Sequence, residues 1–146
     1  MSFKDFRERY EEELRFPIPW VRRLAIDTFD GTHIGNCMVY DIDTVTGEGE
    51  IGIMIGAREF WSRGYGRDAL TLLLEYCFAM PSMRRIYLHT LEWNTRAQRA
   101  FASVGFREVR KVKRAGKDFV LMDIRKPEWL ELRGGIVTKV DAQTDA

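Results

Sequence analysis

Hydrophobic residues at the amino end of the chain recur every three or four positions, between charged residues, over residues 2–15. That spacing predicts an amphipathic helix with one face packed against the rest of the protein. Pro17 and Pro19 follow. Because proline interrupts helical hydrogen bonding, we expect the helix to end before them.

Beyond the prolines, short runs of β-branched and aromatic residues alternate with glycine-containing turns, which is typical of strands joined in hairpins. Asp30-Gly31 and Ala115-Gly116-Lys117 each separate two such runs and are hairpin signals. The expected strands cover residues 24–29, 34–42, 50–56, 86–91, 106–112 and 119–124.

Helical spacing returns in the segment that ends near Met80, where Leu70, Leu73, Leu74 and Cys77 make one apolar stripe. A shorter helix is expected after Asn94, a good N-cap residue, and a helical turn over residues 127–130. The order of elements predicts an α+β fold. It has a mixed, mainly antiparallel sheet with one strand–helix–strand crossover and flanking helices.

The length of 146 residues indicates one domain, which we place at residues 1–130, with a tail over residues 131–146. With 45% hydrophobic and 31% charged residues the chain is typical of a soluble globule, and a net charge of +1 gives no reason to expect nucleic-acid binding. The longest apolar run is too short to span a membrane. Cys37 and Cys77 have no metal-ligand spacing, so we expect no metal and a cytoplasmic location.

The most informative segment runs from Trp61 to Ala69, between an expected strand and an expected helix. A turn rich in glycine and arginine at a helix start offers unpaired backbone N–H groups, a positive dipole end and charge-assisted donors. These features predict a pyrophosphate site. The residues expected to contact the phosphates are Arg63, Gly64, Tyr65, Gly66, Arg67 and Asp68.

Two motifs resemble the GNAT superfamily of acetyl-CoA-dependent N-acetyltransferases. Trp61-Ser62-Arg63-Gly64-Tyr65-Gly66 is similar to that family's turn Gln/Arg-x-x-Gly-x-Gly/Ala, with Trp61 in the first place. Asn94-x-x-Ala97-x-x-x-Phe101-x-x-x-Gly105-Phe106 is similar to its last helix. The tryptophan and the pair Asp68-Ala69 resemble the branch that acetylates the N-terminal alanine or serine of ribosomal proteins. The resemblance covers roughly residues 22–129.

The resemblance implies direct transfer of an acetyl group from acetyl-CoA to a primary amine. Asn94 would reach the pantetheine arm, and backbone N–H groups of the strand over Ile53, Met54 and Ile55 would bind the cofactor and the oxyanion. Glu50, at the start of that strand, would take the proton of the amine. Glu92 and His89 are further candidates for this role, although a structural role is the simpler interpretation of each.

Two departures from the family pattern stand out. The strand and helix that normally precede the amphipathic helix are missing, which would leave a sheet edge uncovered and favour a homodimer. Phe101 stands where many members carry a tyrosine that protonates the departing thiolate. A free thiol, with a pKa of about 8.5, still leaves as an anion.

Two other functions remain open. Gly64-x-Gly66-x-x-Ala69 also fits a dinucleotide fingerprint, although seven residues separate it from the preceding strand and repeated parallel units are lacking. A GNAT-like module could also bind acyl-CoA or a partner without turnover. For an enzyme, the acceptor would be a small-molecule amine or a peptide N-terminal amine, with neither nucleic acid nor membrane as a partner.

Overall fold

The structure, a computed structural model, describes residues 20–56 and 64–133. The expected amphipathic helix over residues 2–15 lies outside these ranges, as do Trp61 and Arg63. A further helix covers residues 126–133, longer than the turn predicted there. The named elements are β1 (Arg22–Asp27), β2 (His33–Asp43), β3 (Glu48–Ile55), α2 (Tyr65–Phe78), β4 (Arg85–Leu91), α3 (Thr95–Ser103), β5 (Arg107–Arg114) and β6 (Lys117–Arg125).

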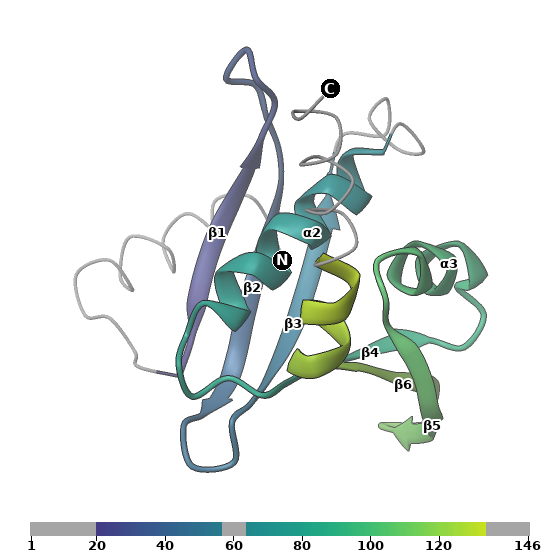
Figure 1. The fold of residues 1–146 in the computed structure, drawn as a ribbon. Helices are drawn as coiled ribbons and strands as arrows, with labels where there is room; N and C mark the ends of the chain where they lie inside the picture. Colours follow the sequence, from purple (N-terminus) through teal and green to yellow (C-terminus); the bar gives the residue numbers. More distant parts are fainter. Residues whose placement is uncertain (1–19, 57–63, 134–146) are drawn as a thin grey trace, which may run out of the picture.

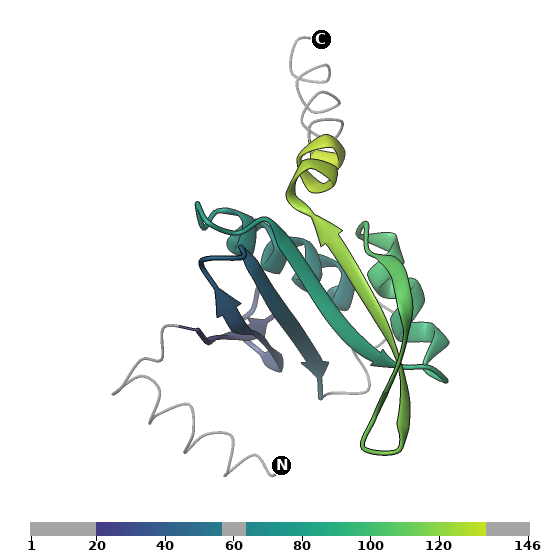
Figure 2. The ribbon, with the colours of Figure 1, turned by 90° about the horizontal axis from the view of Figure 1, so that it is seen from below.

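The strands form one sheet in the order β1-β2-β3-β4-β6-β5. Every neighbouring pair is antiparallel except β3 and β4, which are parallel and are joined through α2. Figures 1 and 2 show α2 and α3 on the same side of this twisted sheet. The predicted α+β fold, with a mainly antiparallel sheet and one crossover, is therefore confirmed.

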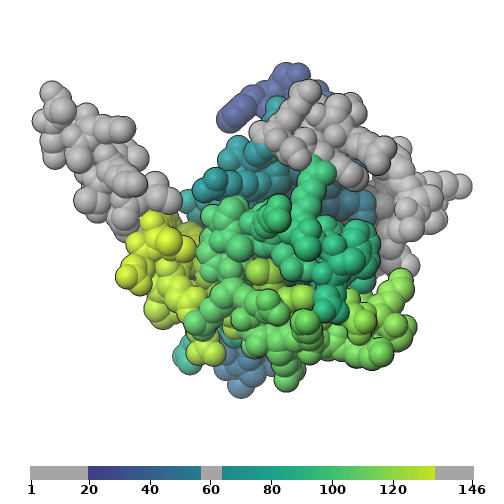
Figure 3. All heavy atoms as spheres, turned by 90° about the vertical axis from the view of Figure 1, so that its right-hand side faces the viewer, coloured from purple at the N-terminus to yellow at the C-terminus, as the bar shows by residue number. Residues whose placement is uncertain are grey.

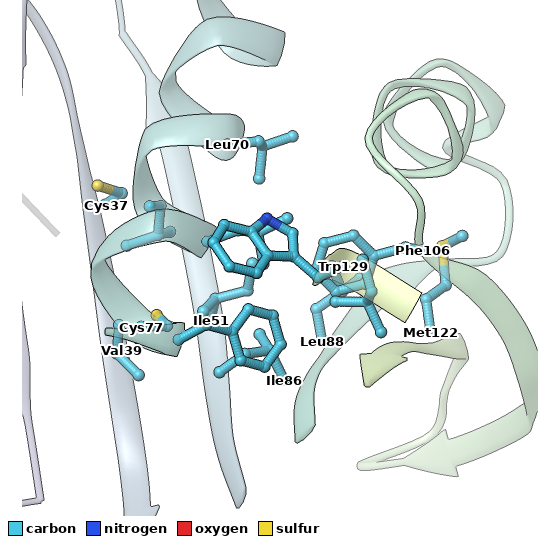
Figure 4. Close-up of a cluster of buried hydrophobic side chains, with 14 of the residues drawn as sticks. Cys37, Val39, Ile51, Leu70, Cys77, Ile86, Leu88, Phe106, Met122 and Trp129 are labelled. Atoms are coloured by element: carbon cyan, nitrogen blue, oxygen red, sulfur yellow. The ribbon is translucent and has the colours of Figure 1, made fainter. Parts of the chain in front are cut away.

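The core lies between the sheet and α2. All four residues of the predicted stripe on α2 are buried, with Leu70, Leu73, Leu74 and Cys77 no more than 2% exposed. Trp129 is directed from the last described helix into the same cluster (Figure 4), where its ring centroid is 5.2 Å from that of Phe78. The helix over residues 126–133 thus closes the core beside α2.

The two predicted hairpins differ in their turns. Ala115 and Gly116 both have positive φ, 50° and 76°, which suits a two-residue turn between β5 and β6. The loop between β1 and β2 is longer, because the strands end at Asp27 and begin again at His33.

Within the described residues, β1 and β5 are the edge strands. β5 is exposed along nearly its whole length, so its basic residues face solvent on both sides of the hairpin. Figure 3 shows α3 and this hairpin on adjoining areas of one face. The homodimer expected from an uncovered sheet edge stays a prediction. Among the helices described, none is long and apolar enough to cross a membrane.

Candidate functional site

β3 and β4 run side by side for a short distance and then separate. Their parallel ladder contains the pairs Glu48↔Arg85, Gly49↔Ile86 and Glu50↔Tyr87, and it ends there. β3 nevertheless continues to Ile55 and β4 to Leu91. The two strands therefore diverge beyond Glu50, and we call the wedge between them the splay.

The backbone of β3 directs alternate amides into the splay. Gly56 N–H donates to the Ile34 carbonyl on β2, with 2.9 Å between the atoms. Opposing residues of antiparallel strands alternate between bonded and non-bonded pairs. Met54 is two residues before Gly56, so its amide also faces β2. The amides of Ile53 and Ile55 alternate with it and face the β4 side. Of the residues suggested for an oxyanion donor, Ile55 has the required orientation and Met54 does not.

The start of α2 lies beside the end of β3. Gly64 precedes the helix with φ 85° and ψ −5°, a left-handed conformation that favours glycine. A Cβ on Gly66 would lie 3.5 Å from Ile55 Cδ1, so the first turn of α2 packs close to the splay. Arg67 and Asp68 are exposed in this turn, while Tyr65 packs against the core. The positive end of the helix dipole thus faces the open end of the splay.

A second helix starts at the end of β4. The Asn94 side chain accepts from the amide of Ala97 at 3.2 Å, which confirms its predicted role as the N-cap of α3. Gln98 donates from its side chain to the carbonyls of Leu91 and Glu92, at 3.2 and 3.0 Å. These bonds fix α3 against the end of β4. The splay accordingly opens between two helix N-termini.

A buried polar cluster lies where the β3–β4 ladder ends. Glu50 is 4% exposed, and one of its oxygens, Oε2, accepts from Tyr40 Oη at 2.6 Å and lies 2.9 Å from His89 Nδ1. The three side chains come from β3, β2 and β4. The His89 side chain is 9% exposed. The His89 ring contacts Tyr87 and Phe119 edge-on, with centroids 6.1 and 6.4 Å apart.

Tyrosines near this cluster are held in their neutral form. Burial, the hydrogen bond to Glu50 and the Glu50 charge all raise the pKa of Tyr40. Burial also raises the pKa of Tyr87, with a contribution from the Glu50 charge. Phe101, in contrast, packs against the core and contacts Phe106 at 5.9 Å between ring centroids. The position of the family's usual tyrosine is thus filled by a packing residue.

A cavity of about 550 Å³ lies at the far end of β4, lined by Leu91, Glu92, Trp93, Lys117 and Asp118. Side chains two residues apart on a strand face the same side, so Leu91 continues the face that carries His89. Glu92 forms an ion pair with Lys111, with 2.9 Å between Oε1 and Nζ, and does not join Glu50. Trp93 is 75% exposed.

On the sequence alone, Glu50 is the candidate base, a structural role is favoured for His89, and Tyr40 is not included. The role of Glu50 stays a prediction. The signal was present in the alternation of the strands, because Glu50 and His89 each occupy a position on the face away from α2. Tyr40 pairs directly with Glu50 across β2 and β3. Which strands are neighbours, however, is not visible in a local pattern.

Among the described residues, this geometry gives no support to a metal site or to a dinucleotide site. No group of three or more His, Cys, Asp or Glu side chains in the part of the chain that the structure describes could hold a metal ion. The dinucleotide-binding fingerprint requires a tight turn between the strand and the helix that follows it. In the structure β3 ends at Ile55 and α2 begins only at Tyr65.

Known proteins that are similar to this chain point to the same fold. The family model described as an acetyltransferase (GNAT) domain matches residues 3–107. A spermidine N(1)-acetyltransferase of Vibrio cholerae is 26% identical over 107 residues, which are 73% of this chain and 60% of that protein. The chain thus spans less than two thirds of the length of this curated relative.

Solved structures of spermidine N-acetyltransferase from Vibrio cholerae have the same fold. The complex with CoA and spermine superposes with a TM-score of 0.76 at 24% identity, covering 89% of this chain and 79% of that one. The complex with manganese ions gives a TM-score of 0.74 at 24% identity, with 89% and 78% covered. The family match agrees with the order of the strands in the sheet and with the splay. The chain therefore belongs to the GNAT acetyltransferase family.

Proposed function

We propose that this protein is an N-acetyltransferase that transfers the acetyl group of acetyl-CoA to a primary amine of a small, cationic acceptor of the polyamine class. The observation that carries the proposal is the splay. Two parallel strands separate between two helix N-termini, and a buried carboxylate–imidazole pair lies where the separation begins. This arrangement offers a slot for a long thioester and a proton acceptor at its inner end.

The cofactor is assigned to the side of the sheet that carries the helices. The pyrophosphate would be bound by the first-turn amides of α2, with Arg63 and Arg67 as charged donors. The pantetheine arm would pass Asn94 and enter the splay. The thioester oxygen would then lie near the amide of Ile53, which is directed toward that space. Backbone donors that are fixed before the reaction stabilise a developing oxyanion effectively.

The acceptor is assigned to the opposite face of the sheet. The cavity beyond Leu91 carries the carboxylates of Glu92 and Asp118 and the indole of the exposed residue Trp93. Carboxylates and aromatic faces both attract alkylammonium groups. Lys117 also lines the cavity and would favour a slender acceptor that keeps its charge away from that side chain. The similarity to a spermidine acetyltransferase supports the same acceptor class.

A peptide N-terminal amine is the competing acceptor, because the tryptophan of the glycine turn resembles the ribosomal-protein branch. In either case the amine attacks only when neutral, so the Glu50–His89 pair would receive its proton. With Phe101 in place of tyrosine, the thiolate would leave without a phenolic acid. This is feasible for a thiol with a pKa of about 8.5.

The first experiment measures thermal unfolding with acetyl-CoA and, as a control, with free NAD. A ligand at about 100 times its dissociation constant adds roughly 2.7 kcal/mol, so we expect a rise of several degrees with acetyl-CoA only. Release of CoA thiol is then followed with spermidine, spermine and peptides that begin with alanine or serine. We expect turnover with the polyamines. Binding of acetyl-CoA without turnover of any amine would favour a non-catalytic module, and preference for the peptides would overturn the polyamine assignment.

A further inference from the structure

Glu50 lies where the β3–β4 ladder ends and is held there by two neighbouring side chains. It is 4% exposed, and the phenol of Tyr40 and the imidazole of His89 both contact the same carboxylate oxygen. A general base needs a free lone pair within hydrogen-bond distance of the proton that it removes. Oε2 is occupied by these two contacts, and only Oε1 remains for another donor. His89 lies further along the splay than Glu50, so the carboxylate is better suited to orient the imidazole than to reach the amine itself.

The hydrogen bond to Glu50 fixes the state of the His89 ring. A carboxylate only accepts, so Nδ1 carries the hydrogen and donates it to Glu50, leaving Nε2 with its lone pair in the neutral ring. Within the described residues, Nε2 has no hydrogen-bond partner, and no side-chain nitrogen or oxygen without a partner is buried there. The lone pair on Nε2 is therefore open to solvent or to a ligand.

The position of His89 matches the reacting centre of the proposed reaction. The β3–β4 ladder ends at Glu50↔Tyr87, and His89 lies two residues further along β4, about 7 Å into the splay at the usual strand rise. Edge-on contacts with Tyr87 and Phe119 restrict rotation of the ring. The side chain of Leu91, next on the same face, lines the cavity assigned to the acceptor.

We propose that His89 is the general base, accepting the amine proton at Nε2, and that Glu50 is a positioning residue held in turn by Tyr40. This assignment rests on the proposed acetyltransferase function and replaces Glu50 as the group that touches the substrate. The titratable groups around the ring are Glu50 from β3, Tyr40 from β2 and Tyr87 from β4, while β6 contributes Phe119.

The proton balance is simple. The bound ammonium gives one proton to Nε2, and the imidazolium is paired with the Glu50 carboxylate. The neutral amine attacks the thioester carbon, a C–N bond forms and the electron pair of the C=O bond moves to oxygen. When the C–S bond breaks and the C=O bond re-forms, one of the two protons left on the attacking nitrogen passes to the thiolate and the other stays in the amide. His89 then releases its proton to solvent. One ammonium and one thioester yield one amide, one thiol and one proton.

The test compares His89→Gln and Glu50→Gln, with His33→Gln as a matched control. His33 also contacts a carboxylate through Nδ1, at 3.0 Å from Asp27, but it is the first residue of β2 and its side chain is 42% exposed. For His89→Gln we expect kcat to fall about 100-fold or more, the size of a general-base effect, with the acetyl-CoA-dependent thermal shift retained. His33→Gln should keep wild-type kinetics.

Glu50→Gln separates the two roles. A glutamine oxygen still accepts from Nδ1–H, so this variant should keep a kcat at least tenfold above that of His89→Gln. Added imidazole should restore part of the activity of His89→Ala, because it supplies the missing base, and should not raise the activity of Glu50→Gln. The reverse order of activities, or full activity in His89→Gln, would overturn the assignment. A wild-type protein that acetylates no amine would remove the proposed function itself, and this inference with it.

Discussion

The guanidinium of Arg85 ties Asp123 of β6 to Glu48 of β3. Nε donates to Asp123 Oδ2 at 2.7 Å, and an Nη atom donates to Glu48 Oε2 at 2.6 Å. Burial disfavours the charged form of Arg85, but the hydrogen bonds to both carboxylates outweigh it and raise the pKa of Arg85. Because Glu48↔Arg85 is the first pair of the β3–β4 ladder, this ion-pair network holds the closed end of the splay.

Replacing Arg85 with methionine should destabilise the protein strongly. Asp123 is only 2% exposed and would keep a buried charge without its main partner, a change that costs about 3–5 kcal/mol. The free energy of unfolding in urea measures the effect. Arg107→Met is the control, since this side chain is 59% exposed and contacts Asp123 at 3.4 Å. Its loss should cost under about 1 kcal/mol, and equal losses would contradict the network.

Gly35 of β2 should not tolerate alanine. A Cβ there would lie 2.1 Å from the carbonyl oxygen of Met54, so β3 would have to move. We expect a loss of about 1–3 kcal/mol in unfolding free energy, as for overpacking, together with slower acetyl transfer because β3 is displaced. Gly52→Ala is the matched control, since its Cβ would make ordinary contacts at 3.6 and 3.8 Å. Similar losses in both variants would argue against the steric explanation.

Two buried thiols should make the folded protein sensitive to alkali. Burial raises the pKa of Cys37 from 9.0 to about 11 and that of Cys77 to about 12, with a further contribution from Cys37 to the latter. Above about pH 9 the unfolded chain loses these protons and the folded chain keeps them. The unfolded state then binds fewer protons, and stability falls as pH rises, by up to about 1.4 kcal/mol per pH unit for each thiol.

Urea unfolding at several pH values between about 8 and 10 measures this slope. Staying below pH 10 limits the contribution of tyrosines, whose ordinary pKa is about 10. The variant with alanine at Cys37 and Cys77 should be less stable overall because cavities remain, yet its stability should change less with pH. An unchanged slope in that variant would show that other groups cause the pH dependence.

The fold was predictable because its signals are local. The stripe on α2, the N-cap at Asn94 and the turn at Ala115-Gly116 each depend on residues close in sequence, and the structure confirms all three. Strand ends were less certain, as shown by β3, which begins at Glu48, two residues before the predicted start.

The candidate site was harder to predict, since it depends on strand register. Tyr40, Glu50 and His89 are far apart in sequence and meet only because β2 and β4 are the two neighbours of β3. A histidine on an alternating strand is most often a packing residue, and no local pattern indicates that a carboxylate lies beside it. Amide orientation is likewise a property of the β2–β3 register, which is why Met54 and Ile55 could not be distinguished from the sequence.

The cavity beyond Leu91 gives the last prediction. If it binds a second ammonium group of the acceptor, Trp93→Ala should raise KM for spermidine about fivefold, corresponding to roughly 1 kcal/mol for a cation over an indole. Asp118→Asn should act in the same direction, and KM for acetyl-CoA should stay unchanged in both. Trp20→Ala is the matched control, because this exposed tryptophan lies before β1 and outside the lining. A rise in KM for acetyl-CoA instead would place the cofactor in this cavity and move the acceptor elsewhere.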